Sequence, residues 1–385
     1  MNFNKVIERK STNATKWNIK DGQLPLWIAD MDFQVAYPIR KALSKRVKNG
    51  IYGYTDISDD FFKSYIKFYK ERYDLKIEKQ DMMFSLGVVP SISSTVRKLT
   101  NVGDNVVVLS PVYNIFYNSI VNNSRNVLEV ELLKNGDDYS IDFENLEKAF
   151  KNEKTTLIIF CNPANPISKI WSKEDMIKLG KLAKENNVVV LSDEIHGFIT
   201  RPNTKYTPFF SLNDTNKYNS VTCISVTKAF NLAGIHTSCI LCPNKELYKK
   251  VNRQINTDEV AEPNVFSIVA SNAALNESRD WLDKMREVVF ENRDYVSNFI
   301  NNNIPSLHVI KGDATYLLWI DCLRVEKDDK KLVEYLKEKT GLYLSSGSTY
   351  GKGGQGFLRM NVACPKSILN DALNRLKEGI GSYLK

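Results

Sequence analysis

Three polar side chains follow apolar, strand-like runs at places where they could bind one ligand. Asn165 follows the run TLIIF, Asp193 follows VVVL, and Lys228 follows VTCIS. In open α/β sheets, ligands bind outside the carboxyl ends of the parallel strands. A lysine, a carboxylate and an amide at such ends could converge on one ligand. The pattern therefore predicts a shared site at this edge of a sheet.

Each of these side chains also has a simpler explanation. Lys228 could be a surface lysine of a helix, Asp193 could cap the next turn, and Asn165 could be a loop amide. These explanations are separate from one another. A shared site accounts for all three at once, because all three follow strands at the same edge.

The segment from about residue 85 to 245 alternates short apolar runs with helical patterns. The runs are rich in β-branched residues, as buried strands are. The predicted strands are 105–109, 127–132, 156–160, 188–191, 221–226 and 238–241. Ser172 and Asp142 precede helical patterns as N-caps. This alternation predicts an α/β fold with a mostly parallel sheet.

The last hundred residues have a different pattern. A long helix is expected near 281–300, followed by the strand-like run YLLWI and two more helices. We therefore predict a large domain, residues 48–284, whose mostly parallel sheet is sandwiched by helices. Residues 1–47 and 285–385 would form a smaller α+β domain.

Composition narrows the class of protein. The net charge is +8, but no compact basic run is present, so no nucleic-acid partner is expected. The N-terminus lacks an apolar signal region, and no apolar run is long enough for a membrane span. Three scattered histidines do not predict a metal site. We expect a cytoplasmic enzyme with a small-molecule substrate.

Several motifs resemble those of a known enzyme family. NPANP, SDEIH and SVTKAFNLAG match the pattern of fold-type I pyridoxal-phosphate enzymes, the aspartate aminotransferase superfamily. Further motifs resemble the cystathionine β-lyase and cysteine-S-conjugate β-lyase branch of class I/II. They are LPLWIADMDF, YGYT, GVVPSI, PVYNIF and GFLRMNVACP. The resemblance covers nearly the whole chain.

The resemblance implies pyridoxal 5'-phosphate as cofactor and a role for each ring-binding residue. Lys228 would hold the cofactor covalently and then move the substrate α-proton. Asp193 would pair with the ring nitrogen and keep it protonated. Tyr113 would stack on the ring, and Asn165 and His196 would lie near its phenolic oxygen. Lys228, Asp193 and Tyr113 are the predicted catalytic residues.

The resemblance also implies how the phosphate is bound. The backbone N–H groups of Gly87 and Val88 precede a helical pattern and would point at the anion. Ser225 would add a hydroxyl. Tyr54 would reach the phosphate from the other subunit, so a homodimer is expected.

Arg359 and the backbone at Ala29 are the expected substrate-binding groups. Arg359 would bind the α-carboxylate through two parallel hydrogen bonds. The implied reaction is β-elimination from cystathionine or a related cysteine conjugate, giving a thiol, pyruvate and ammonia. An aminotransferase acting on an amino acid and a 2-oxo acid is the alternative, and a regulatory protein that retains the cofactor is a third hypothesis.

The chain departs from the family pattern at four places. Ala164 stands where relatives usually have histidine, and Ile167-Ser168 replaces the usual Thr-Gly or Val-Gly. Gly197-Phe198 follows SDEIH where an acidic residue is common soon after. His236 occupies the place of a phosphate-binding arginine in many aminotransferases. These departures bear on substrate shape and phosphate affinity rather than on the ring chemistry.

Overall fold

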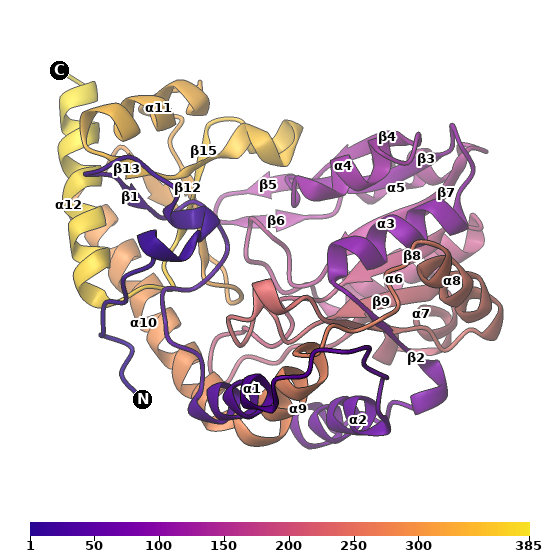
Figure 1. The fold of residues 1–385 in the computed structure, drawn as a ribbon. Coiled ribbons are helices and arrows are strands. Elements are labelled where there is room, and N and C mark those ends of the chain that lie inside the picture. Colours follow the sequence, from indigo (N-terminus) through magenta and orange to yellow (C-terminus); the bar gives the residue numbers. More distant parts are fainter.

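The computed structural model describes residues 1–385, and a seven-stranded sheet forms its centre (Figure 1). Its strands are β2 (Met82–Ser85), β3 (Asn105–Ser110), β4 (Asn126–Glu131), β7 (Thr155–Cys161), β8 (Val189–Asp193), β9 (Ser220–Ile224) and β10 (Ser238–Leu241). The order is β2-β10-β9-β8-β7-β3-β4, and only β10 runs antiparallel to its neighbours. The predicted mostly parallel sheet is confirmed.

Helices cover both faces of this sheet. They are α3 (Val88–Leu99), α4 (Ile115–Val121), α5 (Phe143–Phe150), α6 (Lys173–Glu185), α7 (Asp214–Tyr218) and α8 (Lys245–Thr257). Alternate strand residues point to opposite faces. Val107 and Ile158 pack with α5 and α6, whereas Val106 and Leu157 pack with α3, α4 and α8. Burial on both faces explains why these strands are continuously apolar.

Both predicted helix caps are present. The side chain of Ser172 accepts a hydrogen bond from the Asp175 N–H at 3.0 Å, at the start of α6. Asp142 accepts one from the Asn145 N–H at 3.0 Å, at the start of α5. Each cap satisfies a backbone donor that the helix itself cannot pair.

The C-terminal part has its own antiparallel sheet. It contains β11 (His308–Val309), β12 (Leu317–Asp321), β14 (Ser345–Ser346) and β15 (Phe357–Asn361), in the order β11-β12-β15-β14. The helices beside it are α10 (Arg279–Asn303), α11 (Asp329–Lys339) and α12 (Lys366–Tyr383). The strand β1 (Leu24–Pro25) pairs with β13 (Leu342–Tyr343), so a segment near the N-terminus packs in the C-terminal part of the structure (Figure 1).

The remaining elements connect these two parts. They are α1 (Tyr37–Asn49), α2 (Asp59–Tyr73), α9 (Ser267–Glu277) and the hairpin β5 (Leu133–Asn135) and β6 (Asp138–Ser140). None of the helices combines the length and apolar character needed to cross a lipid bilayer.

The long helix α10 passes from one hydrophobic core to another. Trp281 and Phe290 belong to the core that includes β2, whereas Val296 and Ile300 belong to the core of the C-terminal sheet. The predicted domain boundary at residue 284 falls inside this helix. The division into 48–284 and the two flanking segments remains our proposal.

Candidate active site

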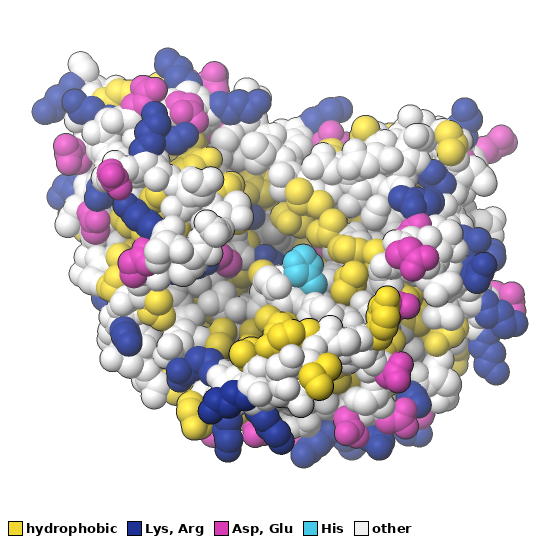
Figure 2. Space-filling view, in the orientation of Figure 1, with side chains coloured by type: hydrophobic (Ala, Val, Ile, Leu, Met, Phe, Trp, Pro, Cys, Tyr) yellow, Lys and Arg dark blue, Asp and Glu magenta, His cyan; other side chains and the backbone are white.

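A cavity of about 250 Å³ lies at the carboxyl ends of the parallel strands. Figure 2 shows a hollow in this face of the molecule, with hydrophobic side chains gathered around it and a histidine inside. The predicted site residues that line the cavity are Ala29, Gly87, Val88, Tyr113, Asn165, Asp193, His196 and Lys228. Residues that are far apart in the sequence therefore meet at one place, as the strand-end argument predicts.

Lys228 contributes the reactive amine. It follows β9, and its Nζ donates a hydrogen bond of 2.6 Å to the Ala29 carbonyl. Removal from bulk water lowers the pKa of Lys228 to about 8, and the charge of Arg359 adds to this effect. The carboxylates of Asp30 and Asp193 oppose it. An amine with this pKa is partly deprotonated near neutral pH, so it can act as a nucleophile and as a base.

Asp193 ends β8 and is almost fully buried. The only hydrogen bond to its carboxylate comes from the Ile195 N–H at 3.0 Å. Burial raises the pKa of Asp193 to about 6, and the Ile195 N–H and the charge of Lys228 limit the rise. A buried carboxylate with a single hydrogen-bond donor favours a cationic ligand, because a cation would stabilise its charged form.

Arg359, on β15, lies beside the cavity. Its guanidinium donates to Asn165 Oδ1 at 3.1 Å and to the Trp27 carbonyl at 2.8 Å, and it lies 4.8 Å from the ring centroid of Tyr350. Its Nε is buried without a hydrogen-bond partner in the protein. A guanidinium held in this way suits the planar carboxylate of a substrate.

His196 is a buried and neutral imidazole. Burial lowers the pKa of His196 to about 3, and the charges of Lys228 and Arg359 lower it further. Its Nδ1 has no hydrogen-bond partner in the protein. A neutral imidazole can donate or accept a hydrogen bond, so His196 fits a polar ligand atom.

The other end of the cavity suits an anion. Gly87 directly precedes α3, which begins at Val88 without a side-chain cap. The first N–H groups of a helix have no partners within it, and the helix dipole favours negative charge there. The hydroxyl-bearing residue Thr227 lines the same cavity.

The family model described as aminotransferase class I and II matches residues 23–376. The chain belongs to this family. It is 36% identical to cystathionine β-lyase PatB of Bacillus subtilis over 387 residues, which covers 99% of this chain and 100% of the relative.

Two solved structures of this family's fold are similar over nearly their whole length. A PLP-bound protein from Clostridium difficile 630, named as an aminotransferase, has a TM-score of 0.95 and 35% identity, covering 98% of this chain and 99% of that one. Cystalysin from Treponema denticola, which contains pyridoxal 5'-phosphate, has a TM-score of 0.96 and 29% identity, covering 100% and 99%. The predicted family and fold are therefore confirmed.

Two predicted cofactor ligands of this aminotransferase-family chain lie outside the cavity lining. The Ser225 hydroxyl donates to the Thr237 carbonyl at 2.6 Å and shares a hydrogen bond with Thr227. Tyr54 is fully exposed and does not line the cavity of its own chain. Their phosphate-binding roles remain predictions.

Sequence reasoning left some lining residues out. Thr227, His236 and Thr237 all line the cavity. The sequence marked His236 only as a departure from the family pattern. Its place after Lys228, where many relatives have arginine, is the signal that could have identified it.

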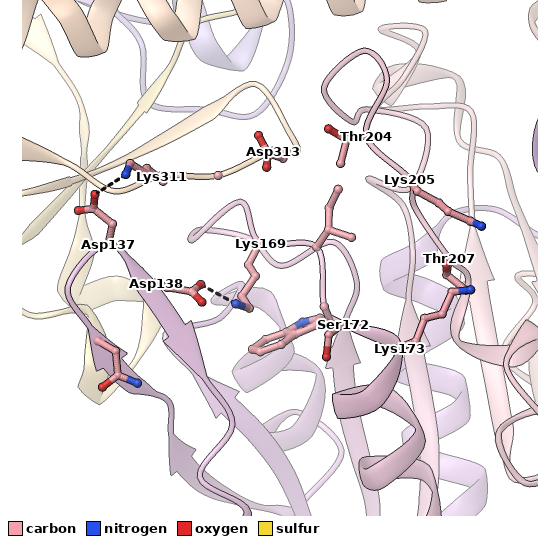
Figure 3. A pocket seen from close by; sticks show the side chains of 14 residues that line it. Asp137, Asp138, Lys169, Ser172, Lys173, Thr204, Lys205, Thr207, Lys311 and Asp313 are labelled. Atoms are coloured by element: carbon pink, nitrogen blue, oxygen red, sulfur yellow. Dashed lines mark hydrogen bonds and ion pairs between the residues drawn. The ribbon is translucent and has the colours of Figure 1, made fainter.

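A larger surface pocket of about 640 Å³ lies elsewhere (Figure 3). Two of its four lysines are engaged with neighbouring carboxylates: Lys169 pairs with Asp138, and Lys311 pairs with Asp137 at 3.4 Å. It contains none of the predicted site residues. The smaller cavity around Lys228 is therefore the candidate active site of this family member.

Proposed function

We propose that the protein is a pyridoxal 5'-phosphate-dependent C–S β-lyase. Its substrate would be cystathionine or a related cysteine conjugate, and its products a thiol, pyruvate and ammonia. The observation that carries the proposal is the meeting of the Lys228 amine, the Asp193 carboxylate and the Arg359 guanidinium around one cavity. The names of PatB, a cystathionine β-lyase, and of a solved C–S lyase from Staphylococcus hominis support the lyase class.

The residues around the cavity fit this cofactor. Asp193 has no strong cationic partner in the chain, and His196 Nδ1 has no hydrogen-bond partner. The ring nitrogen and phenolic oxygen of the cofactor would supply both. The uncapped start of α3 at Val88 would receive the phosphate.

When bound, pyridoxal phosphate supplies an electron-withdrawing ring that stabilises the negative charge developing at the substrate α-carbon. Lys228 would hold the cofactor and then take the α-proton. Asp193 would keep the ring nitrogen protonated, and Tyr113 would cover the ring face. Arg359 would hold the α-carboxylate, so that the α-proton faces Lys228.

The net reaction then requires the C–S bond at Cβ to break. The thiol leaves with a proton, and one water molecule is added as pyruvate and ammonia are released. Thiolates are good leaving groups, so removal of the α-proton is the demanding step. The lowered pKa of Lys228, about 8, suits that step near neutral pH.

A direct assay tests the proposed reaction. The purified protein with its cofactor is incubated with cystathionine or cysteine conjugates, and pyruvate is measured. In a parallel mixture, amino acids and a 2-oxo acid acceptor are supplied. We expect pyruvate release in the first mixture, whereas turnover only in the second would overturn the lyase assignment in favour of an aminotransferase.

Replacement of Arg359 by lysine is expected to raise KM for the amino-acid substrate by about 10- to 100-fold. Lysine keeps the positive charge but loses the planar fork that makes two parallel hydrogen bonds. It also loses the contacts with Asn165 and the Trp27 carbonyl. Steady-state kinetics check this, and an unchanged KM would remove Arg359 from the substrate site.

We also propose a homodimer in which Tyr54 completes the partner's site. Ile51, Tyr52 and Tyr54 are exposed in a segment without regular secondary structure, and Tyr52 and Tyr54 line a surface hollow with Phe266. Exposed apolar side chains gathered in this way are typical of an interface. Tyr54 is available to a second copy of the chain.

Complementation tests the shared site. Lys228→Ala and Tyr54→Ala chains are co-expressed, and each mixed dimer then has one site with both residues intact. Random pairing of a two-fold dimer should restore about one quarter of wild-type activity. Lys228→Ala with Asp193→Asn is the matched control, because both residues line the same chain's cavity and no intact site forms. Equal activity in both mixtures would contradict the proposal.

The cytoplasm is our proposed location. All six cysteines are free and buried. Unpaired thiols are typical of proteins in reducing compartments.

A further inference from the structure

The segment 27–33, called the strap, links the two groups that handle the substrate. Its Trp27 carbonyl accepts a hydrogen bond of 2.8 Å from Arg359, and its Ala29 carbonyl accepts one of 2.6 Å from Lys228. The Tyr316 hydroxyl donates to the same Ala29 oxygen at 3.1 Å. The position of the strap therefore affects both the guanidinium of Arg359 and the amine of Lys228.

The strap is held from its other side by side-chain amides. Asn361 donates to the Ile28 and Asp30 carbonyls at 2.7 and 2.6 Å. Asn231 accepts from the Met31 N–H and donates to the Met31 carbonyl, each at 3.0 Å. The carbonyls of Trp27 and Ala29 thus face the site, whereas those of Ile28 and Asp30 face Asn361. The hydrogen bonds from Asn361 and Asn231 fix the position of the strap.

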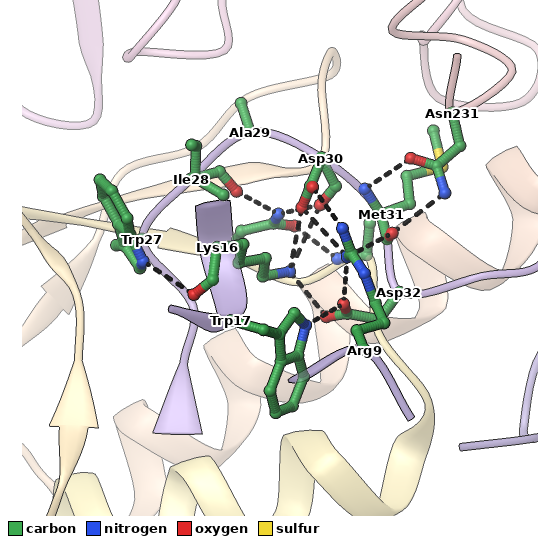
Figure 4. A network of polar contacts seen from close by, with 12 residues as sticks. Arg9, Lys16, Trp17, Trp27, Ile28, Ala29, Asp30, Met31, Asp32 and Asn231 are labelled. Carbon is green, nitrogen blue, oxygen red and sulfur yellow. Dashed lines mark hydrogen bonds and ion pairs between the residues drawn. The ribbon is translucent and has the colours of Figure 1, made fainter. Parts of the chain in front are cut away.

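A cluster of charges, called the clasp, fixes the end of the strap (Figure 4). It consists of Arg9, Lys16, Asp30 and Asp32. Lys16 Nζ lies 2.6 Å from Asp32 Oδ2 and 3.3 Å from the Asp30 carbonyl. Arg9 lies 2.6 Å from Asp32 Oδ1 and 2.7 Å from Asp30 Oδ2, and it donates to the Met31 carbonyl at 3.1 Å.

The clasp is balanced and largely removed from water. Two cations face two carboxylates, Lys16 is 0% exposed and Asp32 5%. Trp17 adds a hydrogen bond of 2.9 Å to Asp32. A buried ion network contributes little net stability, because desolvation offsets most of the attraction. Its main effect is to hold its members in one geometry, and here two of those members belong to the strap.

We propose that Arg9 and Lys16 are positioning residues for the active site. They act through Asp30 and Asp32 on the strap, whose Trp27 and Ala29 carbonyls fix Arg359 and Lys228 relative to each other. The proposal rests on the function proposed above. In an α-amino acid the carboxylate group and the α-proton are bonded to the same carbon, so the guanidinium and the amine must keep one spacing. A misplacement of about 1 Å can lower a rate by about 100-fold.

Arg9 and Lys16 thereby help to position the active site without contacting the substrate. Neither Arg9 nor Lys16 lines the cavity. Arg9 and Lys16 can affect the cavity only through the backbone of the strap. Loss of the clasp should therefore change how the substrate is held and how Lys228 acts, beyond any change in stability.

The test removes one complete ion pair. Lys16→Met with Asp32→Asn leaves Arg9 paired with Asp30, so the cluster stays neutral. We expect amide hydrogen exchange within residues 28–33 of the purified enzyme to accelerate by at least about 10-fold. We also expect kcat/KM to fall by about 10- to 100-fold, with kcat lowered and KM raised together.

The matched control removes an ion pair whose members make no hydrogen bond with the strap. Arg201→Met with Asp294→Asn breaks a two-pronged contact whose distances are 2.9 and 2.8 Å. It should shift the melting temperature without changing the exchange of residues 28–33. Its kcat/KM should stay within about twofold of wild type.

Two further variants keep the proposal testable if the double variant does not fold. Lys16→Arg retains the charge and should retain both exchange and activity. Arg9→Gln removes the cation that is 20% exposed and should give faster exchange at 28–33 and a smaller loss of kcat/KM. The proposal is overturned if the double variant exchanges the amides of residues 28–33 at the wild-type rate. If the double variant does not fold, the same result in Arg9→Gln overturns it. So does faster exchange with unchanged kinetics. The exchange measurement does not depend on which reaction is catalysed. A negative lyase assay, which would overturn the proposed function, is therefore distinguishable from unchanged exchange, which would overturn the role of the clasp.

Discussion

Replacing Lys228 with alanine is expected to lower kcat by at least about 10⁴-fold. Lys228 is the amine that lines the cavity beside Asp193, and its lowered pKa, about 8, makes it both nucleophile and base. Alanine removes the covalent attachment of the cofactor and the group that takes the α-proton. No other lysine lines this cavity.

Absorption and chemical rescue separate these two losses. The visible band of the lysine-bound cofactor, which shifts on borohydride treatment, should be absent from Lys228→Ala. A small external amine such as methylamine should restore part of the turnover, because it can replace the missing base. Lys249→Ala, at an exposed position on α8, is the control and should behave as wild type. An unchanged absorption band in Lys228→Ala would mean that another residue holds the cofactor.

The sequence allowed most of the central sheet to be predicted, because burial on both faces makes a strand continuously apolar. The strand predicted at 238–241 agrees with β10, and five others agree within two residues at each end. Two features were missed. The short strand β2 (Met82–Ser85) has only three apolar residues, none of them β-branched, and the reversed direction of β10 depends on its partners rather than on its own residues.

The sequence places a side chain at the cavity where that side chain follows a strand, but it does not place one where tertiary contacts decide. Asp193 and Lys228 follow strands and line the cavity. Ser225 and Thr227 are two residues apart on one loop, and only the folded structure shows which hydroxyl faces the cavity. Lys16 has no sequence signal at all, since its burial depends on Asp32 and the strap.

Replacing Asp193 with asparagine is expected to lower kcat by at least about 10³-fold. Asparagine keeps the size of the side chain but removes the negative charge that would hold a proton on the ring nitrogen. The ring then withdraws electrons poorly, and the negative charge at the α-carbon loses its stabilisation. Cofactor affinity should fall as well, because the charged pair is lost.

The same substitution should stabilise the protein prepared without cofactor. The folded state holds the Asp193 proton up to about pH 6, whereas an unfolded chain releases it near the ordinary value of 3.8. The folded state therefore binds more protons between these values, so the stability contributed by this group falls as the pH rises through them. Above pH 6 the charged, buried carboxylate costs about 3 kcal/mol, and asparagine does not titrate.

Urea unfolding of the cofactor-free proteins at about pH 4.5 and about pH 7.5 measures this difference. The free energy of unfolding of Asp193→Asn relative to wild type should rise by about 2 kcal/mol between the two pH values, because the rest of the difference has already developed below pH 4.5. Addition of cofactor at the higher pH should reverse the order, because the bound cation stabilises only the charged wild-type carboxylate. If the difference in free energy of unfolding between Asp193→Asn and wild type did not change with pH, burial would not raise the pKa of Asp193. That result would also remove the physical reason for pairing Asp193 with the ring nitrogen.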